Sequence, residues 1–258
     1  NRAASIGAYG SPAVEMITAV FMVLFGINFN VYFFLLIRHF KEAFACEEMR
    51  VYLGVIAAST LAVAGNIFHL YGNVWQSLRY SFFQVASIIT TTGYATTDFN
   101  MWPTFSKAVL VLLMFFGACA GSTGGGIKTT TIFVLAQEIR CIFSKQRPGA
   151  FRRALPANAI AKASTIGLLG MLVVCCTTFL LCILEPGLPF ISLLFEAVSA
   201  YSTAGLSTGI TAQLCLAAKL VLIFTMYTGR VGAFTLLSLW VERPEPNAHF
   251  TEEAITIG

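Results

Sequence analysis

The sequence predicts an all-α membrane protein made of repeated helix–pore helix–helix units with re-entrant pore loops, arranged as a pseudo-symmetric, channel-like bundle. Two observations predict this fold class: an apolar composition with few charges, and an internal repeat of 112 residues. Of the 258 residues, 57% are hydrophobic and 11% are charged, whereas about 25% are charged in a typical globular domain. The composition excludes a soluble enzyme, a nucleic-acid-binding protein and a secreted disulfide scaffold as the main interpretation.

Long apolar blocks and the placement of basic residues predict how the chain crosses the bilayer. Several blocks approach or reach the ~20 residues that a helix needs to span the hydrocarbon layer; they cover residues 13–37, 51–71, 108–119, 166–184 and 214–240. Basic residues gather in two of the connections, and the opposite connections hold almost none. By the positive-inside rule, loops 38–50 and 138–162 are therefore expected to be cytoplasmic.

The internal repeat becomes visible when the chain is shifted by 112 residues. The shift aligns Phe83, Ser87, Thr91, Gly93, Thr96, Lys107 and Gly117 with Phe195, Ser199, Thr203, Gly205, Thr208, Lys219 and Gly229. Each unit has a long apolar segment, a short amphipathic segment, a turn, and a second long apolar segment: 50–71, 74–89, 90–94 and 106–136, then 163–184, 189–201, 202–206 and 213–240. The short segments cannot cross a bilayer and lie between spans whose far ends are both cytoplasmic, so we expect them to be re-entrant.

The two turns offer uncharged oxygen atoms to a cation. Each has hydroxyl side chains followed by a glycine, and glycine permits the positive φ that points successive carbonyls toward a shared axis. Rings of such oxygens replace the hydration shell of a potassium-sized cation. The alternative is a plain helix C-cap with glycine, but two matched turns favour a cation site. The expected filter residues are Thr91, Thr92, Gly93, Tyr94, Thr203, Ala204, Gly205 and Leu206.

A glycine-rich stretch, residues 117–128, interrupts the closing span of the first unit. It contains five glycines, which at about 1 kcal/mol each would strongly destabilise a continuous helix. We therefore expect a break at bilayer depth, where irregular backbone marks a pathway or a gate. Such a loop is expected to have little packing, few fixed hydrogen bonds and low local stability. It is not a phosphate loop, because Ile127 separates Gly126 from Lys128 and no strand precedes it.

Two charged residues, Arg230 and Glu196, lie far from the ends of the apolar segments of the second unit. Arg230 lies within the 213–240 span, and an intramembrane charge indicates function by default; the alternative is a structural tie to helix-end carbonyls or to Glu196. Glu196 itself is either a structural hydrogen-bond partner or a cation attractor. An intramembrane enzyme is not predicted, because the sequence has no HExxH, no Ser/Lys dyad and only one aspartate, Asp98.

These residues resemble the Trk/Ktr/HKT superfamily of potassium transporters, and most closely its bacterial TrkH-type membrane subunit. The stretches with the resemblance are SFFQVASIITTTGYATTDF, GACAGSTGGGIKTTT, MYTGRVGAFTLL and SAYSTAGLSTGIT. The resemblance implies four repeats around one ion path, with Gly93 and Gly205 as the third and fourth filter glycines. It also implies an intramembrane gate formed by Gly121, Gly124, Gly125, Gly126, Lys128 and Arg230.

The resemblance further implies potassium uptake across the plasma membrane, the inner membrane in bacteria, with no enzymatic activity and no covalently bound cofactor. A sodium-permeable relative or another monovalent-cation symporter is the alternative. The implied partners are a second copy of the chain, a cytosolic nucleotide-binding regulatory subunit near loop 138–162, and membrane lipid, but no nucleic acid.

The resemblance divides the chain into three parts and implies that a piece is missing. Residues 1–49 match the end of repeat two, with a post-filter linker, a closing span at 13–37 and a cytoplasmic loop; residues 50–149 match repeat three, and residues 150–258 match repeat four with a short tail. The chain begins without Met, so we expect repeat one and the second filter to lie upstream. Two of four filter walls should not conduct by themselves, and the first filter position, which distinguishes potassium from sodium in some members, is not in this sequence.

Overall fold

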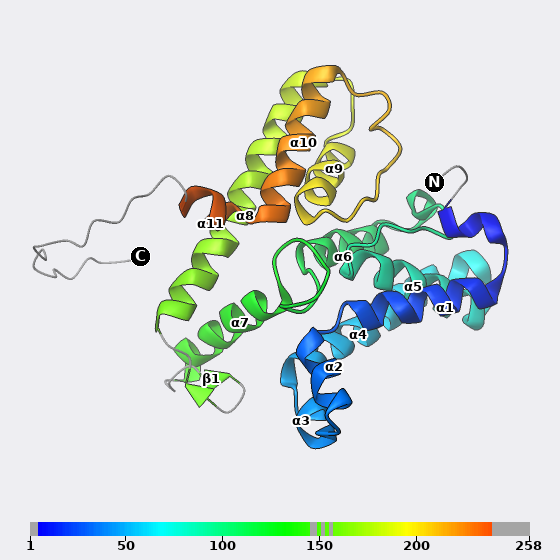
Figure 1. The fold of residues 1–258 in the computed structure, drawn as a ribbon. Helices are drawn as coiled ribbons and strands as arrows, with labels where there is room; N and C mark the ends of the chain where they lie inside the picture. Colours follow the sequence, from blue (N-terminus) through cyan, green and yellow to red (C-terminus); the bar gives the residue numbers. More distant parts are fainter. Residues whose placement is uncertain (1–4, 145–148, 151–152, 155–156, 239–258) are drawn as a thin grey trace, which may run out of the picture.

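The computed structural model describes residues 5–144, 149–150, 153–154 and 157–238. Its elements, in chain order, are η1 (Ser5–Tyr9), α1 (Pro12–Phe25), α2 (Phe29–Leu36), α3 (Phe40–Phe44), α4 (Glu47–Tyr71), α5 (Val74–Ile89), η2 (Phe99–Met101), α6 (Thr104–Phe115), α7 (Thr129–Ser144), β1 (Gly149–Ala150), β2 (Arg153–Ala154), α8 (Ala157–Leu184), α9 (Phe190–Ser202), α10 (Leu216–Val231) and α11 (Ala233–Ser238). The antiparallel pair β1–β2 is the only sheet among the described residues. The prediction of an all-α fold is confirmed (Figure 1).

The two opening spans and the two short re-entrant segments form where the sequence places them. Residues 47–71 and 160–184 are each long and apolar enough to cross a bilayer. The short segments become α5, with the expected bounds, and α9, one residue later than expected. Between α4 and α5 the chain reverses in two residues: Gly72 adopts φ +62° and Asn73 caps α5 by accepting a hydrogen bond from Trp75 N at 2.9 Å. Each short helix leads into a turn, called here the first turn (residues 90–94) and the second turn (residues 202–206).

All three closing spans are interrupted, and the sequence predicted only one of these breaks. The expected break after α6 is present, with the glycine-rich loop, residues 117–128, between α6 and α7. The expectation of one closing helix over 13–37 is wrong, because α1 and α2 meet at an angle of 91°. The expected 213–240 span also ends early: α10 stops at Val231, and Gly232, with φ +92°, leads into α11.

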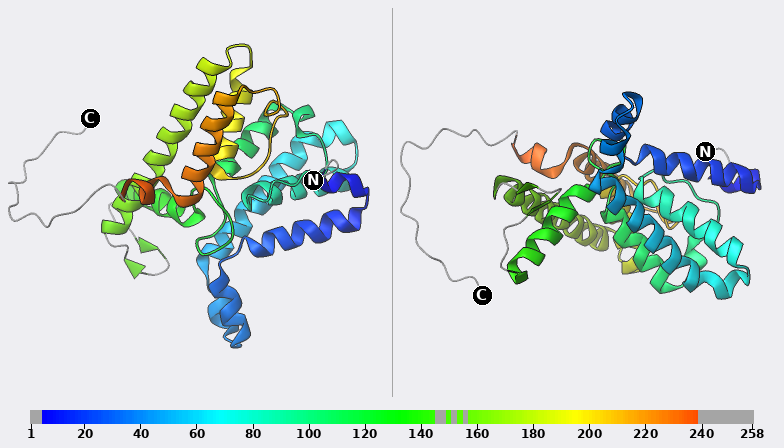
Figure 2. Two further views of the ribbon diagram at one scale, coloured as in Figure 1. Left: turned by 45° about the horizontal axis from the view of Figure 1, so that its top comes forward. Right: turned by 90° about the horizontal axis from the view of Figure 1, so that it is seen from below.

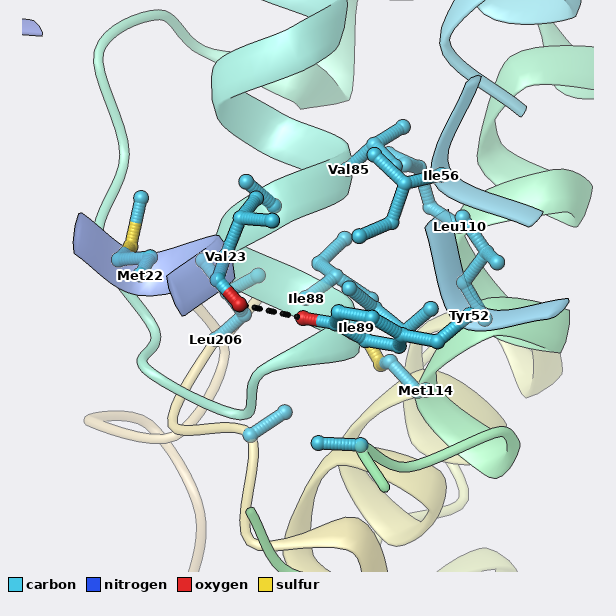
Figure 3. Close-up of a cluster of buried hydrophobic side chains, with 14 of the residues drawn as sticks. Met22, Val23, Tyr52, Ile56, Val85, Ile88, Ile89, Leu110, Met114 and Leu206 are labelled. Atoms are coloured by element: carbon cyan, nitrogen blue, oxygen red, sulfur yellow. Dashed lines mark hydrogen bonds between the residues drawn. The ribbon is translucent and has the colours of Figure 1, made fainter. Parts of the chain in front are cut away.

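The helices form two groups that meet near the glycine-rich loop (Figure 1). Helices α4, α5 and α6 pack together with α1, helices α8, α9 and α10 form the second group, and α6 packs on α9 between them. The largest buried cluster lies behind the first turn, where Val85, Ile88 and Ile89 of α5 face Tyr52 and Ile56 of α4 (Figure 3). In a bilayer such contacts stabilise through close packing and hydrogen bonds rather than by removing apolar surface from water.

The described parts of the two basic loops lie at one end of the molecule. Helix α3, in the 38–50 loop, and strand β1, in the 138–162 loop, both lie at the lower end of the view in Figure 1. In the left view of Figure 2, α3 is again the lowest element and the strands lie just below the end of α8. The connection between α9 and α10 runs from the middle of the molecule to the opposite end, where α10 begins. This arrangement agrees with the expectation that both basic loops face the same side of the membrane.

Candidate functional site

The first and second turns have the same backbone conformation. Thr91 and Thr203 both adopt φ +55°, and Gly93 and Gly205 adopt φ +76° and +75°. Threonine rarely adopts positive φ, and such a conformation costs about 1–3 kcal/mol unless surrounding contacts impose it. The 112-residue repeat is therefore a repeat of backbone geometry, strained residues included.

Matching hydrogen bonds impose this conformation. Thr92 N donates to Ser87 O at 2.9 Å, and Ala204 N donates to Ser199 O at 3.0 Å. The hydroxyls of the same two serines donate to the carbonyl groups seven residues further on: Ser87 Oγ to Tyr94 O at 2.6 Å and Ser199 Oγ to Leu206 O at 2.5 Å. Each short helix thus holds its own turn through a matching backbone bond and a matching side-chain bond.

The remaining carbonyl oxygens of the turns are available to a ligand. Among the described residues, the carbonyls of Thr92, Gly93, Ala204 and Gly205 accept no hydrogen bond from the protein. Carbonyls that are buried away from water are mostly paired. Thr92 and Gly205, in contrast, are exposed here. The structure therefore leaves unpaired oxygens in both turns, as a cation site requires.

The two turns lie against each other. A Cβ atom added to Gly93 would lie 2.4 Å from Ala204 O and 3.2 Å from Gly205 Cα, so there is no room for a side chain there. A Cβ on Gly205 would meet only Gly93 Cα, at 3.8 Å. The first turn also borders a cavity of about 430 Å³, lined by Thr92, Tyr94, Thr123 and one face of α1. All eight predicted filter residues thus belong to two adjacent turns.

Hydrogen bonds join the two ends of the glycine-rich loop, at the end of α6 and the start of α7. Gly117 N donates to Ile127 O at 2.7 Å, and Thr129 Oγ1 donates back to Gly117 O at 2.6 Å. A Cβ on Gly117 would overlap the carbonyl of Gly125, at 2.3 Å, so this position needs glycine. The end of α6 and the start of α7 are thereby joined although residues 116–128 lie between them.

The loop contacts both turns directly. Gly125 N donates to Thr91 Oγ1 at 2.9 Å. On the other side, a Cβ on Gly125 would lie 2.0 Å from Thr203 Oγ1 and 2.9 Å from Ser202 O. Only glycine fits between the two threonines, so the loop lies immediately next to the position where the turns meet.

The expectation that the loop makes few fixed hydrogen bonds is wrong. Cys119 N donates to Gly26 O at 3.1 Å, and Phe29 N donates to Gly121 O at 3.2 Å, so the loop binds both sides of the α1–α2 bend. Ala120 N donates to Glu48 Oε1 at 2.7 Å. The sequence showed a stretch without large side chains, but the loop is held through its backbone, by groups from α1, α2 and α4.

Two basic residues complete the site. Lys128 Nζ donates to Gly124 O within the loop, and Arg230 Nη1 donates to Thr123 O at 3.3 Å. Both side chains line a cavity of about 400 Å³ together with the loop and residues 229–235. Five of the six predicted gate residues therefore meet at this cavity, while Gly121 contacts the α1–α2 bend at Asn28 instead. Arg230 is paired with a loop carbonyl rather than with Glu196.

The structure gives structural contacts to Glu196 and to the aligned lysines Lys107 and Lys219. Glu196, which is buried, accepts hydrogen bonds from Ser207 Oγ, Thr208 N and Thr211 Oγ1 at 2.5, 3.0 and 3.0 Å. These bonds hold the segment that follows the second turn. Lys107 Nζ and Lys219 Nζ each donate to a loop carbonyl, Asn100 O and Ala212 O, at 3.3 Å, which is another equivalent pair of the repeat.

Sequence reasoning missed two residues of the site, Asn28 and Glu48. Asn28 caps α2 by accepting from Asn30 N at 2.9 Å, and its amide donates to Glu48 Oε2 at 3.2 Å. An asparagine shortly after Gly26 is a signal for a helix end and a new start, and it could have revealed the bend. Glu48 gave no such signal, because a glutamate at the first turn of a helix is ordinary.

Comparison with known proteins agrees with this geometry. A family model described as TrkH, cation transport protein, matches residues 70–249. The Ktr system potassium uptake protein B of Bacillus subtilis is 28% identical over 96% of this chain and 58% of its own length. The Trk system potassium uptake protein TrkH of Escherichia coli is 32% identical over 92% of this chain and 52% of its own length.

A solved structure has the same fold. The crystal structure of the potassium transporter TrkH from Vibrio parahaemolyticus matches with a TM-score of 0.81 and 27% sequence identity, over 92% of this chain and 54% of that one. The chain thus spans about half the length of the relatives it matches. With the family model matching most of its residues, this chain belongs to the TrkH family of cation transport proteins.

Proposed function

We propose that this chain supplies two of the four walls of a potassium filter, together with the barrier next to it, in a membrane protein for potassium uptake. The observation that supports this most directly is the set of unpaired carbonyls in two adjacent turns of equal conformation. Uncharged carbonyl oxygens suit a cation that gives up its hydration shell at modest cost. The relatives from B. subtilis and E. coli are named for potassium uptake.

The glycine-rich loop is the barrier in this proposal. It binds the first turn through Thr91 and presses against the second turn, so it lies across the exit from the filter. Arg230 adds a positive charge beside it. A unit charge opposes a cation 4 Å away by about 1 kcal/mol in water and by about 4 kcal/mol at an effective dielectric constant of 20. Such a barrier slows passage by about one to three orders of magnitude.

The proposed surroundings are a membrane, a second copy of the chain and a regulatory subunit. The protein lies in the plasma membrane, which is the inner membrane in bacteria, with loops 38–50 and 138–162 on the cytoplasmic side. It forms a homodimer, and a cytosolic nucleotide-binding subunit binds near the basic 138–162 loop. Potassium is the substrate, and no bound cofactor takes part.

The experiment is an ion-flux measurement with the complete four-repeat protein reconstituted into lipid vesicles. Uptake of potassium and of sodium is measured separately, at equal gradients and equal amounts of inserted protein. Potassium uptake well above sodium uptake is expected. Equal uptake of both ions would favour the alternative of a sodium-permeable transporter, and no uptake of either ion would refute the proposal.

A further inference from the structure

We propose that Glu48 is a positioning residue that holds the glycine-rich loop in place and ties it to the cytoplasmic segment 37–46. This inference deepens the proposed function and rests on it in one respect only, namely that the loop is a barrier to ions. Glu48 is the second residue of α4 and is 8% exposed. It has no place in the filter or in the predicted gate.

The Glu48 carboxylate joins two interruptions of the helical structure with its two oxygens. Oε1 accepts from Ala120 N in the glycine-rich loop at 2.7 Å. Oε2 accepts from Asn28 Nδ2 in the α1–α2 bend at 3.2 Å. Phe29 N, next to Asn28, donates to Gly121 O at 3.2 Å. The loop and the bend therefore form one hydrogen-bonded unit, with Glu48 bridging them.

The position of Glu48 in the chain makes this bridge a link to the cytoplasmic side. The chain leaves the site at Asn28, passes through α2 and α3, and returns to it at Glu48 (Figure 1). The hydrogen bond from Asn28 to Glu48 joins the two ends of this segment. At its far end, Phe40 and Phe44 of α3 are exposed, 54% and 65% respectively. Only residues 45–47 separate α3 from Glu48, so a movement of α3 is transmitted to Glu48 over a short stretch of chain.

The charge of Glu48 is compatible with its burial. It lies in the first turn of α4, where the unpaired backbone N–H groups and the helix dipole favour a negative charge. Both of its oxygens have a donor, so the carboxylate is satisfied without a basic partner. A carboxylate accepts stronger hydrogen bonds than a neutral amide oxygen, which suits a residue that must hold a backbone N–H in place.

The test uses a thiol that the loop itself contains. Cys119 lies in the glycine-rich loop and is 0% exposed. In the complete protein with every other cysteine replaced, the rate at which a charged methanethiosulfonate reagent modifies Cys119 reports movement of the loop. This readout does not depend on which ion the protein transports. The variants are Glu48→Ala and Glu48→Gln, and the matched control is Glu47→Gln, in the same helical turn.

We expect Glu48→Ala to speed Cys119 modification by about tenfold, the effect of losing one hydrogen bond to a charged acceptor, and to raise potassium flux in parallel. Glu48→Gln keeps one acceptor oxygen and should give a smaller increase, while Glu47→Gln should match the parent protein. Parent-like modification in a folded Glu48→Ala protein would overturn the proposal. Where Glu48→Ala does not fold, Glu48→Gln decides: faster modification supports the bridge, and an unchanged rate overturns it. If the parent moves no potassium but the labelling still responds to Glu48, the proposed function fails and the bridge stands.

Discussion

The first and second turns share one backbone but have different surroundings. The first turn holds the glycine-rich loop through Thr91, whereas the second turn only touches that loop. The segment after the second turn is held by the Glu196 carboxylate. At the equivalent position of the first unit, the fully buried Gln84 amide makes no hydrogen bond among the described residues. The duplicated sequence thus specifies one backbone geometry for both turns, and the differing neighbours give each turn its own contacts.

The largest expected effect separates the two filter glycines. Gly93→Ala adds a Cβ 2.4 Å from the Ala204 carbonyl and places alanine at φ +76°. Gly205→Ala has a similar φ but meets nothing closer than 3.8 Å, so it carries only the conformational cost of about 1–3 kcal/mol. In the complete protein, the potassium-to-sodium flux ratio should fall by more than about tenfold for Gly93→Ala and clearly less for Gly205→Ala.

Equal decreases of the flux ratio in the two glycine variants would show that the two turns tolerate an added side chain equally. Unchanged ratios in both would mean that the turns are plain helix caps. Inserted protein must be matched in each case, so that lost selectivity is not confused with lost protein.

The second prediction concerns Arg230, whose equivalent in the first unit is Ala118, a fully buried alanine. Arg230→Ala removes a positive charge and the bond to Thr123 O. Potassium flux should rise by about one to three orders of magnitude, and Arg230→Lys should keep part of the barrier. Flux that falls in proportion to lost protein would make Arg230 a structural tie instead.

The third prediction tests whether one turn alone anchors the loop. Thr91→Val keeps the shape of the side chain but removes the acceptor for Gly125 N, while Thr203→Val removes a hydroxyl that makes no bond to the loop in the described residues. Leak flux should rise about fivefold to tenfold in Thr91→Val, in line with one lost hydrogen bond. Thr91→Ser restores an acceptor and serves as the control. A larger leak in Thr203→Val would reverse the assignment.

The smallest effect should appear in stability rather than in transport. Glu196→Gln leaves only one acceptor oxygen for four donor bonds from Ser207, Thr208 and Thr211. Loss of bonds to a charged acceptor should lower the melting temperature by about 3–10 °C. Gln84→Met replaces an amide that makes no bond in the described residues, so the melting temperature should stay the same or rise. Two similar decreases would show that Gln84 has a role that the structure does not reveal.

The parts that the sequence predicted correctly depend on local patterns. The bounds of α5 follow from its short amphipathic pattern, and the two turns follow from their glycines and the repeat. The break after α6 follows from the density of glycine in residues 117–128. Each of these signals lies within a few residues of the feature it predicts.

The parts that the sequence did not predict depend on contacts between distant segments. The bend at Gly26 is stabilised by Cys119, which lies more than ninety residues further along the chain. The hydrogen bonds of the loop join it to α1, α2 and α4, and most of them involve backbone groups. Because every residue has these backbone groups, the sequence does not show which residues form such bonds. Glu48 belongs to this group, since its partners Ala120 and Asn28 are unremarkable residues in the sequence.

The central claim is that the unpaired carbonyls of the two turns bind the transported ion together. Its most direct test is the anomalous scattering of rubidium, a substitute for potassium, in crystals of the complete protein. A peak in contact with the carbonyl oxygens of residues 92–93 and 204–205 is the expected result. A bound rubidium ion found elsewhere in the protein, with no peak between these turns, would contradict the account.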